Sequence, residues 1–380
     1  MKRPAAAAQP AAARNGAPAP QARMEGNGDI AISCYENDVP ACIEADLERL
    51  YGNIYSSLAQ YRIYSDGSDT STYIARRAGE TTAVFLFRVA GNRVQVLNEV
   101  IRLDGDEIAS FSRYAFATYP QVSAIQFKAV CLGDLRLPFP FQRYNHVEDI
   151  VLDLPKSPDC YFEMLGKGTK RNFKRHLRHL DERVPSWRYR VLEREQIDRA
   201  TVDTVIRMNH QRMAGKHKQS DIDCAEAERI WRLARECGLV GVIEIDGRIC
   251  AGTIAFRSGA NYFLNVLAHD PKYDEYWLGI LCCYKTICEA IARRGAEFHF
   301  LWGEYDYKYM LLGVKRDLDN LIVWRSRLHQ VLNPRASAGA VLRGGARGLR
   351  RWLHTASRSD GIGARIALAA LNRLRAVRHG

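Results

Sequence analysis

The sequence predicts an α/β protein with mixed sheets, built from two related units in tandem that a helical segment joins. Three observations lead to this prediction. An order of strand, turn, strand, strand, helix and strand occurs twice, at an offset of roughly 165–170 residues, although no residue-level repeat is visible. Asp246-Gly247, between two apolar runs, is the strongest type of short hairpin signal. The 380 residues also suffice for two domains of about 100–200 residues each.

The first unit begins with a helix-like stretch near residues 46–60. Its expected strands are STYIARRAG (71–79), TAVFLFRVA (82–90), NRVQVLNEVIRL (92–103) and QVSAIQFKAV (121–130). A helix of about fourteen residues is expected to follow Asp104. Segment 134–155 is punctuated by proline, and VEDIVLDL within it alternates like an exposed strand.

The second unit repeats this order. Its expected strands are GLVGVIEI (238–245), RICAGTIAF (248–256), ANYFLNVLAHD (260–270) and EFHFLWG (297–303), with a helix over 276–294. The sequence thus predicts a first unit at 29–160 and a second at 161–330.

The two ends of the chain differ from these units in composition. Residues 1–28 are rich in Ala, Pro, Gly and Gln and have almost nothing to bury, which predicts disorder. Residues 331–380 contain ten Arg, no Lys and one Asp, so this tail carries +9 of the net charge of +12 and leaves +3 for the remainder. Its end reads as a basic amphipathic helix, suited to a membrane surface or a partner, to packing back on the body, or to remaining solvated.

Ten cysteines lack regular spacing, and prolines, Gln and Arg interrupt the stretch where an export signal would need an apolar run. These features predict reduced thiols and a cytoplasmic location. Cys282, Cys283 and Cys288 are expected to be small buried hydrophobes. The histidines of HQRMAGKH (210–217) lack neighbouring acids, so no metal site is predicted, and this stretch reads as a substrate loop or plain surface.

The connector GKGTKRNFKRHLRHLDER (166–183) predicts a helix with one basic face and one apolar stripe. Its candidate substrate-binding residues are Lys170, Arg171, Lys174 and Arg175. A basic face of this kind is either solvated or binds phosphates, acidic glycans or RNA, and the sequence leaves both open.

The helix of the second unit starts differently from its counterpart in the first. The start of a helix presents unpaired N–H groups that attract a pyrophosphate, and Leu278-Gly279 lets a ligand approach the backbone there. In the first unit Asp104, Asp106 and Glu107 already compensate the helix dipole. Only the second helix is therefore a candidate phosphate site, although Asp274 and Glu275 precede it.

Residues from about 166 to 323 resemble the GNAT acyltransferase superfamily, and more closely its branch related to CelD and the FemAB-type transferases. The resemblance rests on KRNFKRHLRHL, IEIDGRICAGTIAF, LGILCCYKTICEAIARRG and FHFLWGEYDYKYMLLG. In the last of these, Gly303 and the Tyr307-Lys308-Tyr309 triplet match the family pattern. Asp306 stands where the family commonly has Pro, and Met310 where it has a basic residue.

The resemblance implies two GNAT-like units, of which the second binds acetyl-CoA or another acyl-CoA without a metal. The two strands that flank the helix at 276–294 would splay apart and expose backbone groups to the cofactor. The implied cofactor-binding residues are Val266, Leu267, Trp277, Leu278, Gly279, Ile280 and Lys285.

The implied catalytic residues are Glu304, Asp306, Tyr307 and Lys308, with Tyr309 as a further substrate-binding candidate. A carboxylate would take a proton from the amine, a tyrosine would protonate the departing thiolate, and Lys308 would hold an anionic group. Glu244 is a further candidate base, unless ordinary strand alternation explains it. Tyr305, Tyr309 and Leu312 are alternatively expected to form the buried side of a helix.

The function that the resemblance implies is N-acylation of a polar small-molecule or glycan amine, with an amino sugar of polysaccharide or envelope metabolism as one candidate. A FemAB-like transferase that uses aminoacyl-tRNA is an alternative, for which the basic helix would supply phosphate contacts. A binding protein that retains the fold without catalysis is a third.

Overall fold

The computed structural model describes residues 22–25, 30–65, 69–215 and 220–333. The N-terminal unit contains β1 (Ala22–Glu25), β2 (Ile30–Tyr35), η1 (Ala41–Ile43), α1 (Glu44–Tyr51), η2 (Ile54–Ser56), α2 (Leu58–Tyr64), β3 (Ser71–Arg77), β4 (Glu80–Ala90), β5 (Arg93–Val96), β6 (Arg102–Leu103), α3 (Gly105–Thr118), β7 (Ala124–Leu132) and β8 (Phe141–Asp153).

The C-terminal unit contains α4 (Pro158–Met164), α5 (Lys167–Arg183), β9 (Arg188–Glu193), η3 (Arg194–Gln196), α6 (Arg199–Ala214), α7 (Cys224–Cys237), β10 (Gly238–Ile245), β11 (Arg248–Ser258), β12 (Asn261–His269), η4 (Pro271–Tyr276), α8 (Leu278–Ala292), β13 (Glu297–His299), α9 (Asp306–Met310), β14 (Val314–Trp324) and α10 (Arg327–Leu332). The predicted α/β class with mixed sheets is confirmed.

The described strands form one continuous sheet in the order β1-β2-β3-β4-β5-β7-β14-β8-β13-β12-β11-β10-β9, with β6 paired to β7. Most neighbours are antiparallel, but β5 and β6 are each parallel to β7, and β12 is parallel to β13. The pairs β5–β7 and β12–β13 occupy equivalent places in the two units, since a helix, α3 or α8, lies between the strands of each pair in the sequence.

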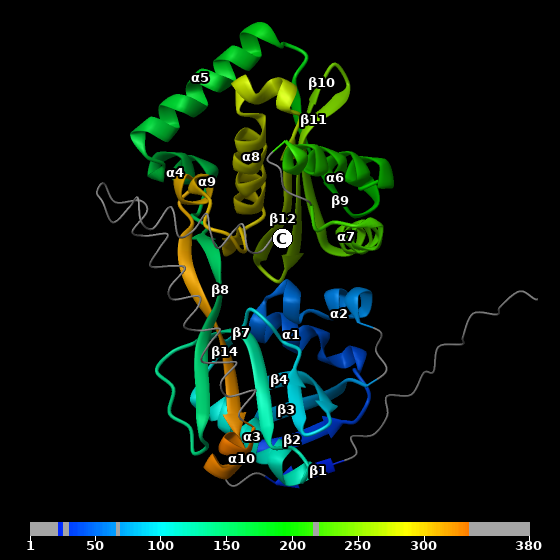
Figure 1. Ribbon diagram of the computed structural model, residues 1–380. Helices are drawn as coiled ribbons and strands as arrows, with labels where there is room; N and C mark the ends of the chain where they lie inside the picture. Colours follow the sequence, from blue (N-terminus) through cyan, green and yellow to red (C-terminus); the bar gives the residue numbers. More distant parts are fainter. Residues whose placement is uncertain (1–21, 26–29, 66–68, 216–219, 334–380) are drawn as a thin grey trace, which may run out of the picture.

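The two units exchange their last strands. Strand β8 ends the N-terminal unit but pairs with β13, and β14 ends the C-terminal unit but pairs with β7. The two exchanged strands also pair with each other and run along one side of the molecule from one unit to the other (Figure 1). The boundary predicted near residue 160 therefore separates β8 in sequence from both of its neighbours in the sheet, β13 and β14.

Helices cover both faces of the sheet in each unit (Figure 1). In the C-terminal unit α8 packs on one face, while α6 and α7 pack on the other. Two buried residues of the N-terminal unit, Ile54 and Ala59, belong to the core beneath α6 and α7. The units are further joined where Gly259 N donates to Glu48 and Asn261 donates to Gly52 O.

Several local expectations differ from the structure. The stretch 46–60 is not one helix, because the chain breaks at Gly52 in the left-handed region (φ 48°). VEDIVLDL is not an exposed strand: Ile150, Val151 and Leu152 are all buried, since β8 lies inside the sheet with both faces covered. Residues 22–25, expected to be disordered, form the edge strand β1, which pairs with β2.

Gly241 of β10 lies where a side chain would overlap Thr286 Oγ1 and stand 2.8 Å from both Thr253 Oγ1 and Tyr189 Oη. These hydroxyls form a buried chain, with Thr253 and Thr286 2.7 Å apart. Gly241→Ala is therefore expected to lower the free energy of unfolding by about 1–3 kcal/mol, as measured by urea denaturation. Gly133→Ala is the control, because a Cβ there meets nothing within 4 Å. Equal losses in the two variants would contradict this packing.

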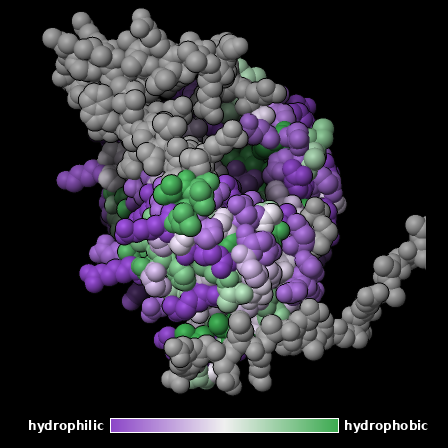
Figure 2. All heavy atoms as spheres, turned by 60° about the horizontal axis from the view of Figure 1, so that its bottom comes forward, coloured by the Kyte–Doolittle hydropathy of each residue, from purple (hydrophilic) through white to green (hydrophobic). Residues whose placement is uncertain are grey.

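The side of the molecule turned forward in Figure 2 is mainly hydrophilic, and its hydrophobic areas are small and separate where grey atoms do not cover them. Isolated apolar residues of this kind are normal on a protein surface. None of the helices in the described part of the chain has the length and apolar character that crossing a bilayer requires. The predicted amphipathic helix of the tail lies outside the described residues.

Candidate active site

Strands β12 and β13 diverge at the centre of the C-terminal unit. They pair in parallel only from Asn261–Glu297 to Phe263–His299. Beyond this point the chain after β13 stays on β8, where Phe300 N donates to Ile150 O at 2.8 Å, while β12 continues to His269. The divergence leaves backbone groups of β12 facing a gap, as the resemblance implied.

A bulge in β12 lies at the start of this gap. Val266 pairs with Ile254 and Leu264 pairs with Ala255, so Asn265 is an extra residue without a partner in β11. Bulges redirect side chains and often lie beside active sites. Asn265 is exposed and contributes to the wall of a pocket, whereas Val266 is buried in the core.

The pocket at the divergence has a volume of about 190 Å³ and draws on both units. Its wall consists of Tyr55, Asn209, Arg212, Leu264, Asn265, Leu267, Phe300, Leu301, Trp302, Tyr305, Tyr307 and Lys308. Tyr55 comes from η2 of the N-terminal unit, and Asn209 and Arg212 come from the last turns of α6. The Nε of Arg212 is buried and has no hydrogen-bond partner in the described part of the chain.

Lys308 is the charged group at the base of this pocket. Its side chain is only 2% exposed, and its Nζ donates to Leu301 O at 2.9 Å and to Trp302 O at 2.6 Å. Burial lowers the pKa of Lys308 to about 8, although the charges of Asp149 and Glu148 oppose this shift. An ammonium has three N–H donors, so the two carbonyls leave one for a ligand.

Aromatic rings surround the mouth of the pocket. Tyr305 and Trp302 are 52% and 39% exposed, and the ring of Tyr55 lies 5.2 Å from that of Trp302. Tyr307 lies deeper, and burial raises the pKa of its hydroxyl well above the usual value. The expectation that Tyr305 packs inside a helix is wrong, because α9 has only five residues and begins after it.

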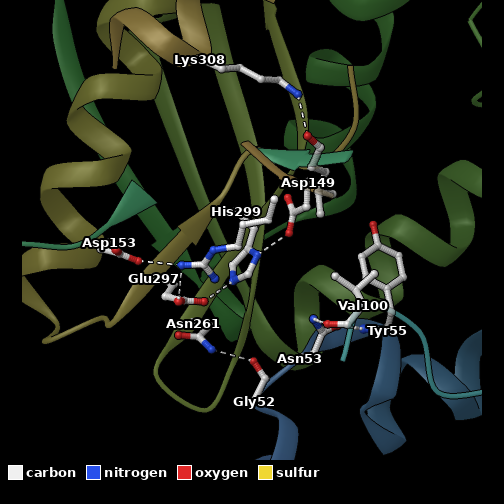
Figure 3. A network of polar contacts seen from close by, with 12 residues as sticks. Gly52, Asn53, Tyr55, Val100, Asp149, Asp153, Asn261, Glu297, His299 and Lys308 are labelled. Carbon is white, nitrogen blue, oxygen red and sulfur yellow. Dashed lines mark hydrogen bonds and ion pairs between the residues drawn. The ribbon is translucent and has the colours of Figure 1, made fainter. Parts of the chain in front are cut away.

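A buried charge network lies below the pocket (Figure 3). His299 Nδ1 is 2.7 Å from Asp149 Oδ2 of β8, and His299 Nε2 is 3.1 Å from Glu297 Oε2. Arg316 of β14 contacts both Glu297 and Asp153 at 2.8 Å. The network therefore joins β8, β13 and β14 near the end of the β12–β13 pairing.

The network favours the protonated form of His299. Burial alone would lower its pKa, but hydrogen bonding to Asp149 and Glu297, together with their charges, raises the pKa above the ordinary value. The contact with His299, followed by that with Arg316, lowers the pKa of Glu297 to about 2. His299 also stacks on Phe263 with ring centroids 4.3 Å apart.

The start of α8 retains the features of an anion site. Its N-cap, Trp277, is in the left-handed region (φ 59°), and the first turn contains no acidic residue. Asp274, which could have compensated the dipole, lies 2.7 Å from His269 Nε2. Gly279 is required here, since a Cβ would stand 2.7 Å from His269 Nδ1.

Helix α3 of the N-terminal unit confirms the predicted contrast. Asp104 and Glu107 form a capping box, in which each side chain accepts a hydrogen bond from the backbone N–H of the other residue. The first N–H groups of α3 are therefore already partly satisfied by its own carboxylates.

The basic helix α5 borders the start of α8. Trp277 stacks on His176 with ring centroids 5.0 Å apart and meets Phe173 edge-on, and both residues belong to α5. The opposite side of α5 forms a shallow basic hollow with α4. The lining residues are Phe162, Glu163, Lys167, Lys170, Arg171, Lys174, Arg175 and Arg178.

Among the candidate site residues, the structure brings Leu267, Tyr307 and Lys308 together in the pocket wall. Trp277, Leu278, Gly279 and Ile280 lie together at the start of α8, and Lys285 lies further along it. Lys170, Arg171, Lys174 and Arg175 share the hollow on α5.

The three carboxylates that were candidate catalytic residues all lie outside the pocket wall. Glu304 is exposed and contacts Lys315 and Tyr309, and Asp306 is exposed at the first position of α9. The candidate base Glu244 is buried and is held by Arg188 and Arg190 of β9 at 2.7 and 2.9 Å. This ion pairing explains Glu244 better than either a catalytic role or half-exposed strand alternation.

Sequence reasoning missed Tyr55, Asn209, Arg212 and Asn265. Arg212 lies within HQRMAGKH, which the sequence suggested as a substrate loop. Among the described residues no group of three or more His, Cys, Asp or Glu side chains is arranged to hold a metal ion.

Part of the chain matches a known family in sequence. Residues 167–309 match the family described as acetyltransferase (GNAT) domain. The matched segment runs from the first residue of α5 to Tyr309, so it includes the splayed strands, the start of α8 and Lys308. No curated protein matches the chain in sequence.

Solved structures share the fold of nearly the whole described chain. FemX is 9% identical, with 78% of this chain and 99% of FemX covered at a TM-score of 0.56. A conserved protein of unknown function from Bacteroides thetaiotaomicron VPI-5482 is 13% identical, with 76% and 99% covered at 0.52. L-PGS from Bacillus licheniformis is 14% identical, with 82% and 98% covered at 0.50. At these identities the likeness is one of fold.

Proposed function

The chain belongs to the GNAT superfamily through its acetyltransferase domain at residues 167–309, and on this premise we propose that it is an N-acyltransferase. The donor is an acyl-CoA, with acetyl-CoA as the first candidate, and the acceptor is the amine of a polar molecule. The observation that carries the proposal is a pocket with a buried lysine at the divergence of β12 and β13, in a unit whose helix α8 has no acidic residue in its first turn.

The donor would lie along the open side of β12. Its amide-bearing arm would pair with backbone groups beyond Phe263, as an added strand pairs with a sheet edge. The pyrophosphate would meet the N–H groups of Leu278, Gly279 and Ile280, where the helix dipole favours negative charge. The thioester carbonyl would then reach the pocket at Lys308.

Acyl transfer forms a carbon–nitrogen bond and breaks the carbon–sulfur bond of the thioester. Attack of the neutral amine makes the carbonyl oxygen negative, and the remaining N–H of Lys308 would stabilise that oxygen. The departing thiolate takes a proton, for which Tyr55, Tyr305 and Tyr307 supply the hydroxyls in the wall. The wall contains no carboxylate among the described residues, so the amine would lose its proton through water.

A second donor class, aminoacyl-tRNA, is favoured by one observation. The hollow on α5 gathers six Lys and Arg side chains near the start of α8. Among the described residues, carboxylates pair only with Lys170, through Glu163, and with Arg178, through Glu182. A polyphosphate chain would find several cations there.

Thermal unfolding with each donor separates the two classes. Acetyl-CoA at about 100 times its dissociation constant is expected to add about 2.7 kcal/mol to the stability of the full chain, whereas uncharged or charged tRNA is expected to add nothing. The variant Lys167→Glu/Arg171→Glu tests the hollow, with Arg207→Glu on α6 as the matched control. If aminoacyl-tRNA alone stabilises the protein, and the double variant loses this stabilisation, the donor is an aminoacyl-tRNA and not an acyl-CoA.

A further inference from the structure

A second and larger pocket lies in the N-terminal unit. Its volume is about 460 Å³, and it is enclosed by η2 and α2 on one side and by the ends of β4 and β5 on the other. The lining residues are Tyr55, Ser56, Ser57, Gln60, Tyr61, Tyr64, Ser65, Leu86, Arg88, Leu97, Asn98 and Glu99. Unlike the hollow on α5, this wall is mainly hydroxyl, amide and aromatic.

The two charged residues of this wall are already compensated. Arg88 Nε is 2.8 Å from Asp69, and the same guanidinium donates to Ser65 and Thr70. Glu99 is 2.7 Å from Lys128. A charged ligand would therefore compete with an existing partner for either group, which favours an electrically neutral ligand.

Asn98 supplies the most specific feature. The residue is 1% exposed, its Oδ1 accepts from Leu86 N at 2.8 Å, and its Nδ2 is buried without a hydrogen-bond partner in the described part of the chain. Buried amide donors are almost always paired, so an unpaired one beside a pocket indicates a missing acceptor. The side chains of Gln60 and Tyr61 likewise make no hydrogen bond to other described residues.

We propose that this pocket binds a neutral saccharide. Ring hydroxyls both donate and accept, so they match Asn98 Nδ2, the Gln60 amide and the Tyr61 hydroxyl, which between them offer both functions. The rings of Tyr55, Tyr61 and Tyr64 provide apolar surfaces for the C–H faces of a sugar. We name this site the saccharide pocket.

The saccharide pocket and the pocket at Lys308 have one lining residue in common, Tyr55. Figure 3 shows the Tyr55 hydroxyl directed away from Asn53 and Val100. Asn53 Nδ2 donates to Val100 O and so holds the start of η2 in place. A molecule longer than one sugar that binds in the saccharide pocket would have to extend past Tyr55 to bring an amino group near Lys308. This link to acyl transfer rests on the proposed function, whereas saccharide binding itself does not.

Saturation-transfer NMR on the full chain tests the binding. The probes are the neutral tetrasaccharides cellotetraose and N-acetylchitotetraose, with inorganic phosphate as the anionic competitor and the cationic tetramer of glucosamine as the charged comparison. We expect magnetisation transfer to at least one neutral tetrasaccharide, insensitive to phosphate. Transfer to neither neutral tetrasaccharide at millimolar concentration, or displacement by phosphate, overturns the proposal.

Two sets of variants locate the binding. Gln60→Leu/Tyr61→Phe removes polar groups from the wall and is expected to weaken saccharide binding at least tenfold, while Tyr35→Phe, outside both pockets, leaves it unchanged. Asn98→Asp retains the acceptor for Leu86 N and removes the unpaired donor, with the same expected loss. Unchanged binding in folded forms of both variants would show that the sugar binds elsewhere.

Lys308→Met separates this inference from the proposed function. It is expected to retain wild-type saccharide affinity while acyl transfer is lost. If the wild type binds the saccharide but catalyses no acyl transfer, the saccharide pocket is supported and the acyltransferase proposal is rejected. If it acylates simple amines but binds no saccharide, the acyltransferase proposal is supported and the saccharide pocket is rejected.

Discussion

Lys308→Met is expected to lower kcat for acyl transfer by about 10²–10³-fold, because it removes the donor that we propose stabilises the developing oxyanion. Methionine retains the buried aliphatic stem, so the loss should come from the ammonium and its contacts with Leu301 O and Trp302 O. The measurement is steady-state release of free CoA with a fixed amine acceptor. Far-UV circular dichroism and thermal unfolding of the variant provide the control for folding.

The pH dependence gives a second signature of Lys308. Because burial lowers its pKa to about 8, kcat of the wild type is expected to fall as the pH rises through about 8, once the acceptor amine is neutral. Stability should change in the opposite direction, since the unfolded chain, with the ordinary pKa of 10.5, binds the proton more tightly between these values. If Lys308→Met had the wild-type turnover and an unchanged pH profile, Lys308 would have only a structural role.

His299→Leu is expected to lower the free energy of unfolding by about 3–5 kcal/mol, because it leaves Asp149 buried without its cationic partner. Both side chains are almost fully inaccessible, at 6% and 2% exposure. The measurement is urea denaturation of the full chain. The double variant His299→Leu/Asp149→Leu should recover part of the loss, and strict additivity of the two single changes would contradict direct coupling.

The stabilisation by this network should depend on pH in a defined direction. The folded-state pKa of His299 is raised, so its contribution is complete below the ordinary value of 6.5 and is lost as the pH rises through the folded-state value. The pKa of Glu297 is lowered to about 2, so its contribution is complete above 4.5 and is lost as the pH falls toward 2. The stability difference between wild type and His299→Leu should therefore shrink at alkaline pH.

Local signals in the sequence predicted local structure well. Asp246 and Gly247 both have positive φ, at 50° and 75°, which the hairpin signal requires. The apolar stripe of α5 is also confirmed, since Phe173 and Leu180 are fully buried. In each case the determining contacts lie within a few residues along the chain.

The exchange of β8 and β14 could not be predicted in the same way. Period-2 alternation reports which face of a strand is covered, but not which strand lies beside it. The residues of the candidate site were equally difficult to predict. Tyr55, Arg212 and Lys308 are far apart in sequence and come together only through the packing of η2, α6 and α9. Tyr307 and Lys308 were found because a short motif contains both.

Calorimetric titration of the full chain with acetyl-CoA tests the central claim most directly. We predict saturable binding at one site, weakened about tenfold or more in Gly279→Asp, which adds a carboxylate to the start of α8 and a Cβ that would press on His269. Absence of saturable binding by acetyl-CoA and CoA, or equal affinity in Gly279→Asp, would contradict an acyl-CoA site between β12 and α8.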